Sequence, residues 1–196
     1  YRPLPASKRD EWLGRVVKTI IDGDLDRAGD HRLPVWEAGW SENLNDTLVP
    51  KYFGKFPVVR WCREFIEPID PRFEYEAFGI IKDWLFDKYL RDVPHIFEFG
   101  CGTGHNLIAA QRVNPGAMLH ALDWARSSQQ IIDANATKFR NRVMAYNFDL
   151  FKPQGAFALL NGAGVFTAAA LEQIGGRFGP FIDWLIERRP GIVIHI

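Results

Sequence analysis

Three glycines at alternating positions of one short loop constrain this chain more than any other feature of its sequence. Gly100, Gly102 and Gly104 directly follow His95–Phe99, an aromatic and apolar run that predicts a buried strand. Glycine lets the chain turn sharply there and lets a ligand approach the backbone closely. The residues from Gly104 to Val113 then have helical spacing. A strand, a glycine loop and a helix in this order predict an α/β fold with a ligand site at the loop.

Strands and helices alternate along the rest of the chain. Apolar runs bounded by turn residues predict four further strands, at 117–122, 143–146, 164–167 and 192–196. Helical spacing predicts two further helices, at 127–139 and 179–187. Short connections between them indicate a doubly wound, mostly parallel sheet with helices on both faces. Ligands of such sheets bind beyond the carboxyl ends of the strands.

The first 72 residues differ in character. Prolines interrupt any long helix there, so we expect an irregular extension with one short helix over 11–21. Trp36, Trp40 and Tyr52 are candidate lid residues, although a packing arm explains them slightly better, and Arg60 is a candidate partner for a carboxylate or phosphate of a ligand. A region of 1–72 would then precede a domain of 73–196, which opens with an amphipathic helix.

Two residues beside the glycine loop separate two classes of ligand. A dinucleotide fingerprint has a third glycine where this chain has His105. Glu98 lies in the strand two residues before the first glycine, and a buried carboxylate requires a partner, such as the ammonium of a bound amino acid. Asp123 could accept both ribose hydroxyls of either ligand, or could cap a helix. Asp149 could meet an adenine amino group, or could belong to a turn.

The run from Ile96 to Leu107 resembles the first motif of the class I, Rossmann-like, S-adenosylmethionine-dependent methyltransferases. Asp123 with Trp124 is similar to the second motif, and 147–149 to the third. The run 165–174 is similar to the end of the fourth strand, with Gln173 where many members have histidine. The resemblance implies S-adenosylmethionine as cofactor, bound by Glu98, Gly100, Cys101, Gly102, Gly104, Asp123, Trp124, Asn147, Asp149 and Thr167. Because the family's sheet has seven strands, we expect this chain to be truncated after the fifth.

Methyl transfer requires alignment, a dry pocket and, for a hydroxyl or amine acceptor, a base. His195, at the end of the fifth predicted strand, is the first candidate for that base, although a structural role suits it somewhat better. His105 is the second candidate. The expected function is methyl transfer to a small-molecule or sugar-type acceptor. The alternatives are an NAD(P)-dependent oxidoreductase and a non-catalytic S-adenosylmethionine-binding module.

Charge and cysteine content narrow the choice of partners and surroundings. The formal net charge is zero, which gives no support for nucleic acid as a partner. The two cysteines, Cys62 and Cys101, show no zinc-site spacing, so no metal is expected and a reducing, cytoplasmic setting is favoured. No apolar run is long enough to predict a membrane span. The oligomeric state is left open.

Overall fold

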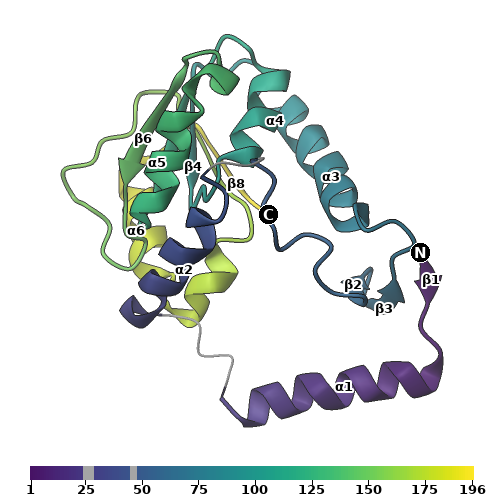
Figure 1. Cartoon of the computed structure of the whole chain (residues 1–196). Helices are drawn as coiled ribbons and strands as arrows, with labels where there is room; N and C mark the ends of the chain where they lie inside the picture. The colour runs from purple at the N-terminus through teal and green to yellow at the C-terminus, as the bar shows by residue number, and fades with distance from the viewer. Residues whose placement is uncertain (24–28, 45–47) are drawn as a thin grey trace. The chain divides into compact units, whose positions relative to one another are not determined.

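A computed structural model describes residues 1–23, 29–44 and 48–196 (Figure 1). The chain forms two compact units. The first consists of Tyr1–Arg27 and Lys51–Ile80, and the second of Ala28–Pro50 and Ile81–Ile196. Residues 28–50 thus group with the C-terminal part, whereas the proposed domain boundary at residue 72 stays a prediction.

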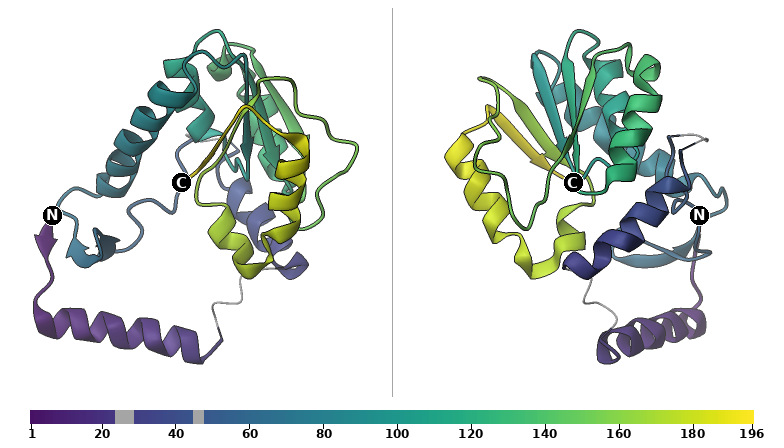
Figure 2. Two further views of the ribbon diagram at one scale, coloured as in Figure 1. Left: turned by 180° about the vertical axis from the view of Figure 1, so that it is seen from behind. Right: turned by 60° about the vertical axis from the view of Figure 1, so that its left-hand side comes forward.

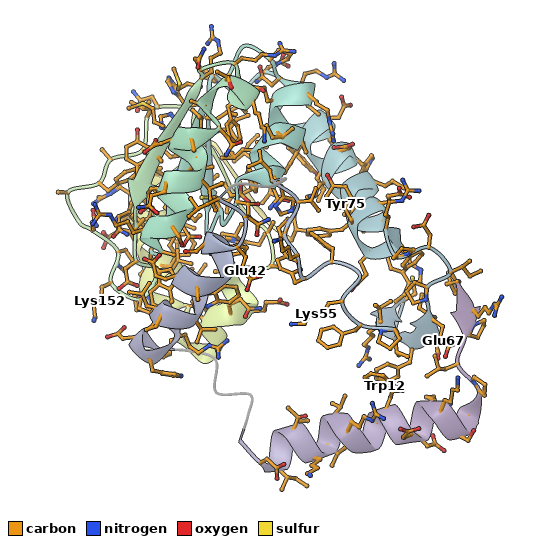
Figure 3. All side chains as sticks on the ribbon, in the orientation of Figure 1. Trp12, Glu42, Lys55, Glu67, Tyr75 and Lys152 are labelled. Atoms are coloured by element: carbon orange, nitrogen blue, oxygen red, sulfur yellow. The ribbon has the colours of Figure 1, made fainter. Side chains whose placement is uncertain are left out.

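The first unit contains a small antiparallel sheet and a long helix. Its strands are β1 (Arg2–Pro3), β2 (Val59–Trp61) and β3 (Glu64–Glu67), in the order β1-β3-β2. Arg2 pairs with Glu67 across the sheet. The helix α1 (Ala6–Ile21) begins five residues earlier than expected, and its Lys8 forms an ion pair of 3.0 Å with Glu67, which Figure 3 labels. The N-terminal part is thus helical, as expected, and it also contains a small antiparallel sheet that the sequence did not predict.

The second unit is built on a parallel sheet of five strands (Figure 2). The strand order is β6-β5-β4-β7-β8. Every neighbouring pair in it is parallel, which confirms the expected doubly wound sheet. The strand bounds are β4 (His95–Phe99), β5 (Met118–Asp123), β6 (Val143–Asn147), β7 (Gly164–Thr167) and β8 (Ile192–His195).

Helices connect and cover these strands. The long helix α3 (Phe73–Tyr89) precedes β4, and α4 (His105–Val113), α5 (Arg126–Ala134) and α6 (Gly179–Arg188) follow β4, β5 and β7. The helix expected over 127–139 ends early, because Asn135 leaves helical geometry and a 3-10 turn, η2 (Ala136–Phe139), follows. Two further 3-10 segments are η1 (Asp30–Arg32) and η3 (Leu171–Arg177). The helix α2 (Leu33–Ser41), which was not expected, packs against α5.

The pleat of the sheet divides the core into two faces. Alternate residues of β4 point to opposite sides, so Ile96 joins Leu107 of α4 and Phe86 of α3, whereas Phe97 and Phe99 point the other way. The second face is mostly aromatic and includes residues of α6. By the same alternation Glu98 points to the face covered by α3 and α4, although it is a carboxylate.

Candidate functional site

The glycine loop lies between β4 and α4, and both ends of it are fixed by the backbone. The N–H groups of Gly100 and Cys101 donate to the carbonyl of Leu122, at 2.8 and 3.0 Å. Gly102 has a φ of +53°, which favours glycine, and a Cβ atom there would lie 2.7 Å from Cζ2 of Trp40. Gly104 adopts the left-handed conformation and begins α4. The loop therefore requires glycine at position 102 for two reasons: its backbone conformation, and the space that the ring of Trp40 occupies.

Asp123 ends β5 beside this loop. One carboxylate oxygen accepts the N–H of Gly102 and the other that of Ala125, each at 2.9 Å. Burial raises the pKa of Asp123 to about 6, while the backbone hydrogen bonds oppose that rise. Asp123 is the last residue of β5, and it holds the loop that follows the neighbouring strand β4.

Glu98 is fully buried in β4. Its Oε1 accepts a hydrogen bond of 2.7 Å from Nδ2 of Asn106 in α4. Its Oε2 has no hydrogen-bond partner among the described residues. Burial raises its pKa to about 8, and the charge of Lys82 in α3 opposes that rise. A buried carboxylate with one unsatisfied oxygen is suited to accept a hydrogen bond from a ligand.

The helix α2 and Leu48 hold the loop from an earlier part of the chain. Trp40 covers Gly102 and stacks on Trp36, with ring centroids 5.4 Å apart. The carboxylate of Glu37 accepts the N–H groups of Arg126 and Ser127, at 2.5 and 2.8 Å, and so caps the N-terminus of α5. The hydroxyl of Thr103 also donates to the carbonyl of Leu48.

The other proposed cofactor residues lie at the carboxyl ends of β5, β6 and β7. Nδ2 of Asn147 donates to the carbonyl of Trp124 at 2.7 Å. Asp149 accepts the N–H of Phe151, two residues further on, at 2.8 Å, which is the turn alternative raised above. Thr167 is buried at the end of β7.

Cys101 is buried within the glycine loop, and its Sγ lies 3.4 Å from Oγ of Ser128 in α5. Burial raises the pKa of its thiol well above the ordinary value, and the charges of Asp123 and Glu98 add to that rise. Both Cys62 and Cys101 are free thiols. The Cys101 side chain therefore packs within the loop as a neutral thiol.

The two candidate bases have different surroundings. His195 is an exposed residue of β8, and its Nδ1 lies 2.8 Å from Oγ1 of Thr167. Burial of part of its ring lowers its pKa. His105 is buried at the start of α4, with Nδ1 3.4 Å from Oγ1 of Thr103, and burial lowers its pKa to about 3. His105 is thus a much weaker proton acceptor than an ordinary imidazole.

Two further sequence candidates belong to the first unit. Tyr52 is exposed and packs on Phe53, with ring centroids 4.6 Å apart. The guanidinium of Arg60 lies 5.9 Å from the ring centre of Phe65, within the small antiparallel sheet. Their proposed roles toward a ligand stay predictions.

Sequence reasoning missed three polar residues that surround the loop. Glu37 caps α5, and Lys82 and Asn106 form a hydrogen-bonded chain to Glu98. Lys82 lies four residues before Phe86 in α3, so helical spacing places the two on the same face. That spacing alone does not predict that a lysine is buried. The signal that could have found Asn106 is its position in the helical turn after the glycine loop, eight residues from Glu98.

The parallel sheet, the glycine loop and the helices on both faces are the Rossmann-like fold of the class I methyltransferases. The [4+2]-cyclase SpnF shares it, with a TM-score of 0.50 at 17% identity over 61% of this chain and 45% of that protein. A precorrin-6y C5,15-methyltransferase from Geobacter metallireducens matches at 24% identity, over 57% of this chain and 58% of that one, with a TM-score of 0.44. A methyltransferase from Geobacter sulfurreducens, solved with S-adenosyl-L-homocysteine, matches at 22% identity over 58% and 47%, with a TM-score of 0.42.

These matches concern parts of each molecule. The chain spans about half the length of the solved proteins that it matches. No protein-family model and no curated protein matches the chain. The likeness to SpnF therefore establishes the fold, and a fold of this kind does not by itself define the chemistry of its site.

The described residues offer neither a candidate membrane span nor a candidate metal cluster. Across residues 1–23, 29–44 and 48–196, no helix is both long and apolar enough to cross a membrane. Within the same ranges, no group of three or more His, Cys, Asp or Glu side chains is arranged to hold a metal ion.

Proposed function

We propose that this chain is an S-adenosylmethionine-dependent methyltransferase that acts on a small-molecule or sugar-type acceptor. The observation that carries the proposal is a pair of buried carboxylates, Glu98 and Asp123, on neighbouring strands beside one glycine loop. Burying two carboxylates so close together is costly unless a ligand or the protein compensates for them. The protein provides such compensation to Asp123, but leaves one oxygen of Glu98 unsatisfied among the described residues.

The polar groups of the site suit the parts of S-adenosylmethionine. Oε2 of Glu98 would accept a hydrogen bond from the ammonium of the methionine portion. Asp123 would accept the ribose hydroxyls, exchanging or sharing its backbone hydrogen bonds. Trp124, Asn147 and Asp149 would surround the adenine. Because the ring of Trp40 covers Gly102, a ligand on the loop would contact or displace this ring.

The cofactor supplies an electrophilic methyl group on a sulfonium, so the protein's task is to align the acceptor and exclude water. His195 is the stronger of the two candidate bases. Its lowered pKa keeps the imidazole neutral near pH 7, and with Nδ1 held by Thr167, Nε2 would accept the proton of the acceptor. His105, buried and of much lower pKa, would serve the site as a neutral hydrogen-bonding group.

Two rival functions stay testable. SpnF is named as a cyclase, so this fold carries reactions other than methyl transfer. A non-catalytic module or an enzyme of another reaction would bind the cofactor without transferring its methyl group. An NAD(P)-dependent oxidoreductase would need close approach of a pyrophosphate to the start of α4, where this chain has His105. A cytoplasmic location agrees with the free thiols and is part of the proposal.

Isothermal titration with S-adenosylhomocysteine and with NAD tests the proposal directly. We expect S-adenosylhomocysteine alone to bind. Asp123→Ala should weaken this binding by about 1–3 kcal/mol, because charge-assisted hydrogen bonds are lost. Asp133→Ala, an exposed acid on α5, is the matched control and should leave the affinity unchanged. Binding of NAD alone would refute the proposal.

Methyl transfer itself is tested with a labelled donor and a panel of small-molecule acceptors. Transfer to an acceptor establishes the enzyme class, and His195→Ala should then slow transfer with little loss of cofactor affinity. Binding of S-adenosylhomocysteine without transfer to any acceptor of a broad panel would favour the non-catalytic module.

A further inference from the structure

Lys82 is a charged residue in an unusual place. It lies in α3 on the face that covers the sheet, and only 2% of its surface is exposed. Lysine is almost never fully buried unless it is paired. The same helix carries Lys88 on its exposed side, so a lysine in α3 has no general need to be buried. The position of Lys82 therefore requires a specific explanation.

A chain of two hydrogen bonds connects Lys82 to Glu98. Nζ of Lys82 donates to Oδ1 of Asn106 at 2.5 Å, and Nδ2 of Asn106 donates to Oε1 of Glu98 at 2.7 Å. All three side chains are buried, and they come from α3, α4 and β4. The amide of Asn106 is thereby fixed with its oxygen toward the cation and its nitrogen toward the carboxylate. This arrangement holds Oε1, while Oε2 has no hydrogen-bond partner within the part of the chain that the structure describes.

The charges around this chain act in opposite directions on Glu98. Lys82 favours the carboxylate, whereas burial and the charge of Asp123 favour the protonated acid. Burial lowers the pKa of Lys82, while Glu98 and Asp83 of its own helix favour its charged form and Arg112 of α4 disfavours it. Lys82 also disfavours protonation of His105, and Glu98 disfavours ionisation of Cys101. Among the described residues, Lys82 is thus a cation that favours the ionised form of Glu98.

We propose that Lys82 and Asn106 are positioning residues that favour the ionised form of Glu98 and hold it oriented, with Oε2 presented to the ammonium group of an amino-acid-bearing ligand. This inference rests on the proposed function, because it assigns the residues that act on Glu98, the carboxylate proposed to bind the cofactor's ammonium. Neither residue touches the ligand in this scheme. They act on it through the charge state and rotamer of Glu98.

The test compares two ligands that differ in the amino-acid portion. S-adenosylhomocysteine carries the ammonium, whereas 5′-methylthioadenosine lacks the whole amino acid. For the unmodified protein, affinity for the first should rise from about pH 7 to about pH 9, as Glu98 ionises, and affinity for the second should stay flat over the same range, because Asp123 is already ionised there. Lys82→Met should move this rise to higher pH and weaken S-adenosylhomocysteine about tenfold or more at pH 7, since one pKa unit is a factor of ten. It should leave 5′-methylthioadenosine within about twofold.

Three comparisons keep the test decisive. Lys88→Met, the exposed lysine of the same helix, should change neither affinity. Lys82→Arg, which keeps the cation, should restore part of the pH profile. If Lys82→Met does not fold, Asn106→Ala carries the test, because it breaks the chain while leaving the lysine in place, and it should also shift the profile.

The outcomes separate this inference from the proposed function. If the unmodified protein binds neither ligand, the proposed function fails, and the inference fails with it. If the unmodified protein binds both ligands but Lys82→Met and Asn106→Ala weaken them equally, or leave the pH profile unmoved, the proposed function stands and the positioning role is overturned.

Discussion

Gly102→Ala tests the fit between the glycine loop and Trp40. The change adds one methyl group at a residue with φ of +53°, and that group would lie 2.7 Å from Cζ2 of Trp40. Left-handed geometry costs a non-glycine residue about 1–2 kcal/mol. Overpacking against the ring adds about 1–3 kcal/mol. The free energy of unfolding should therefore fall by about 2–5 kcal/mol in the unmodified background.

A double-mutant cycle separates these two costs. In a Trp40→Ala background the ring is gone, so Gly102→Ala should cost only the backbone part, about 1–2 kcal/mol. Denaturant unfolding followed by circular dichroism measures all four proteins. Gly79→Ala is the matched control, because that helical glycine has open space around it and should not be destabilised. Equal costs for Gly102→Ala in the two backgrounds would refute the contact between the ring and the loop.

Three further changes test the surroundings of the site. Glu37→Ala should cost about 0.5–2 kcal/mol in unfolding experiments, because it removes the cap of α5, and a loss below that range would show that water replaces the carboxylate. Asn114→Ala should cost about 1–3 kcal/mol, because its amide donates to the carbonyls of Leu90 and Val93; an unchanged denaturation midpoint would contradict this. The pKa of His120 is lowered by burial to about 4, so the unfolded chain binds its proton first and stability should fall as the pH drops from about 6.5 to about 4. His120→Gln should therefore reduce the change of the unfolding free energy over this pH range. An unchanged pH dependence would show that other groups cause it.

The parallel sheet could be predicted closely from the sequence, because each strand is a short apolar run between clear turn signals. The predicted bounds of β4 and β7 are those observed, those of β6 and β8 differ by one residue at one end, and that of β5 is shifted by one residue at both ends. In a sheet buried on both faces, the apolar run and the strand coincide. The end of α5 was missed because Asn135 leaves the helix within a stretch of otherwise helical residues.

The N-terminal part could not be predicted in the same way. Its strands are two to four residues long, and Arg2 pairs with Glu67 from a distant part of the chain, so no local pattern reveals them. Pro34 was interpreted as a helix breaker, yet it lies in the first turn of α2, where proline is tolerated. The rule about proline was therefore applied without regard to position within a helix.

The candidate site shows the same division. The glycines, Glu98 and Asp123 lie on one continuous pattern of strands, loop and helix, so the sequence was enough to propose them as site residues. The supporting groups come from outside that pattern. Glu37 bonds to backbone N–H groups, which every sequence offers, and Lys82 is connected to Glu98 through the amide of Asn106. Interactions of these kinds have no sequence signature of their own.

The packing of α2 on α5, with the hydrogen bonds of Glu37, has a consequence for the order of folding. Glu37 accepts hydrogen bonds from Arg126 and Ser127, which follow it in the chain by 89 and 90 positions. Closing a loop of that length costs about 4 kcal/mol of chain entropy by the logarithmic law. The sheet and its helices can assemble through shorter closures, so α2 is expected to dock late and to detach early. In native-state hydrogen exchange, the amides of Arg126 and Ser127 should then open well before those in the middle of β4 and β5.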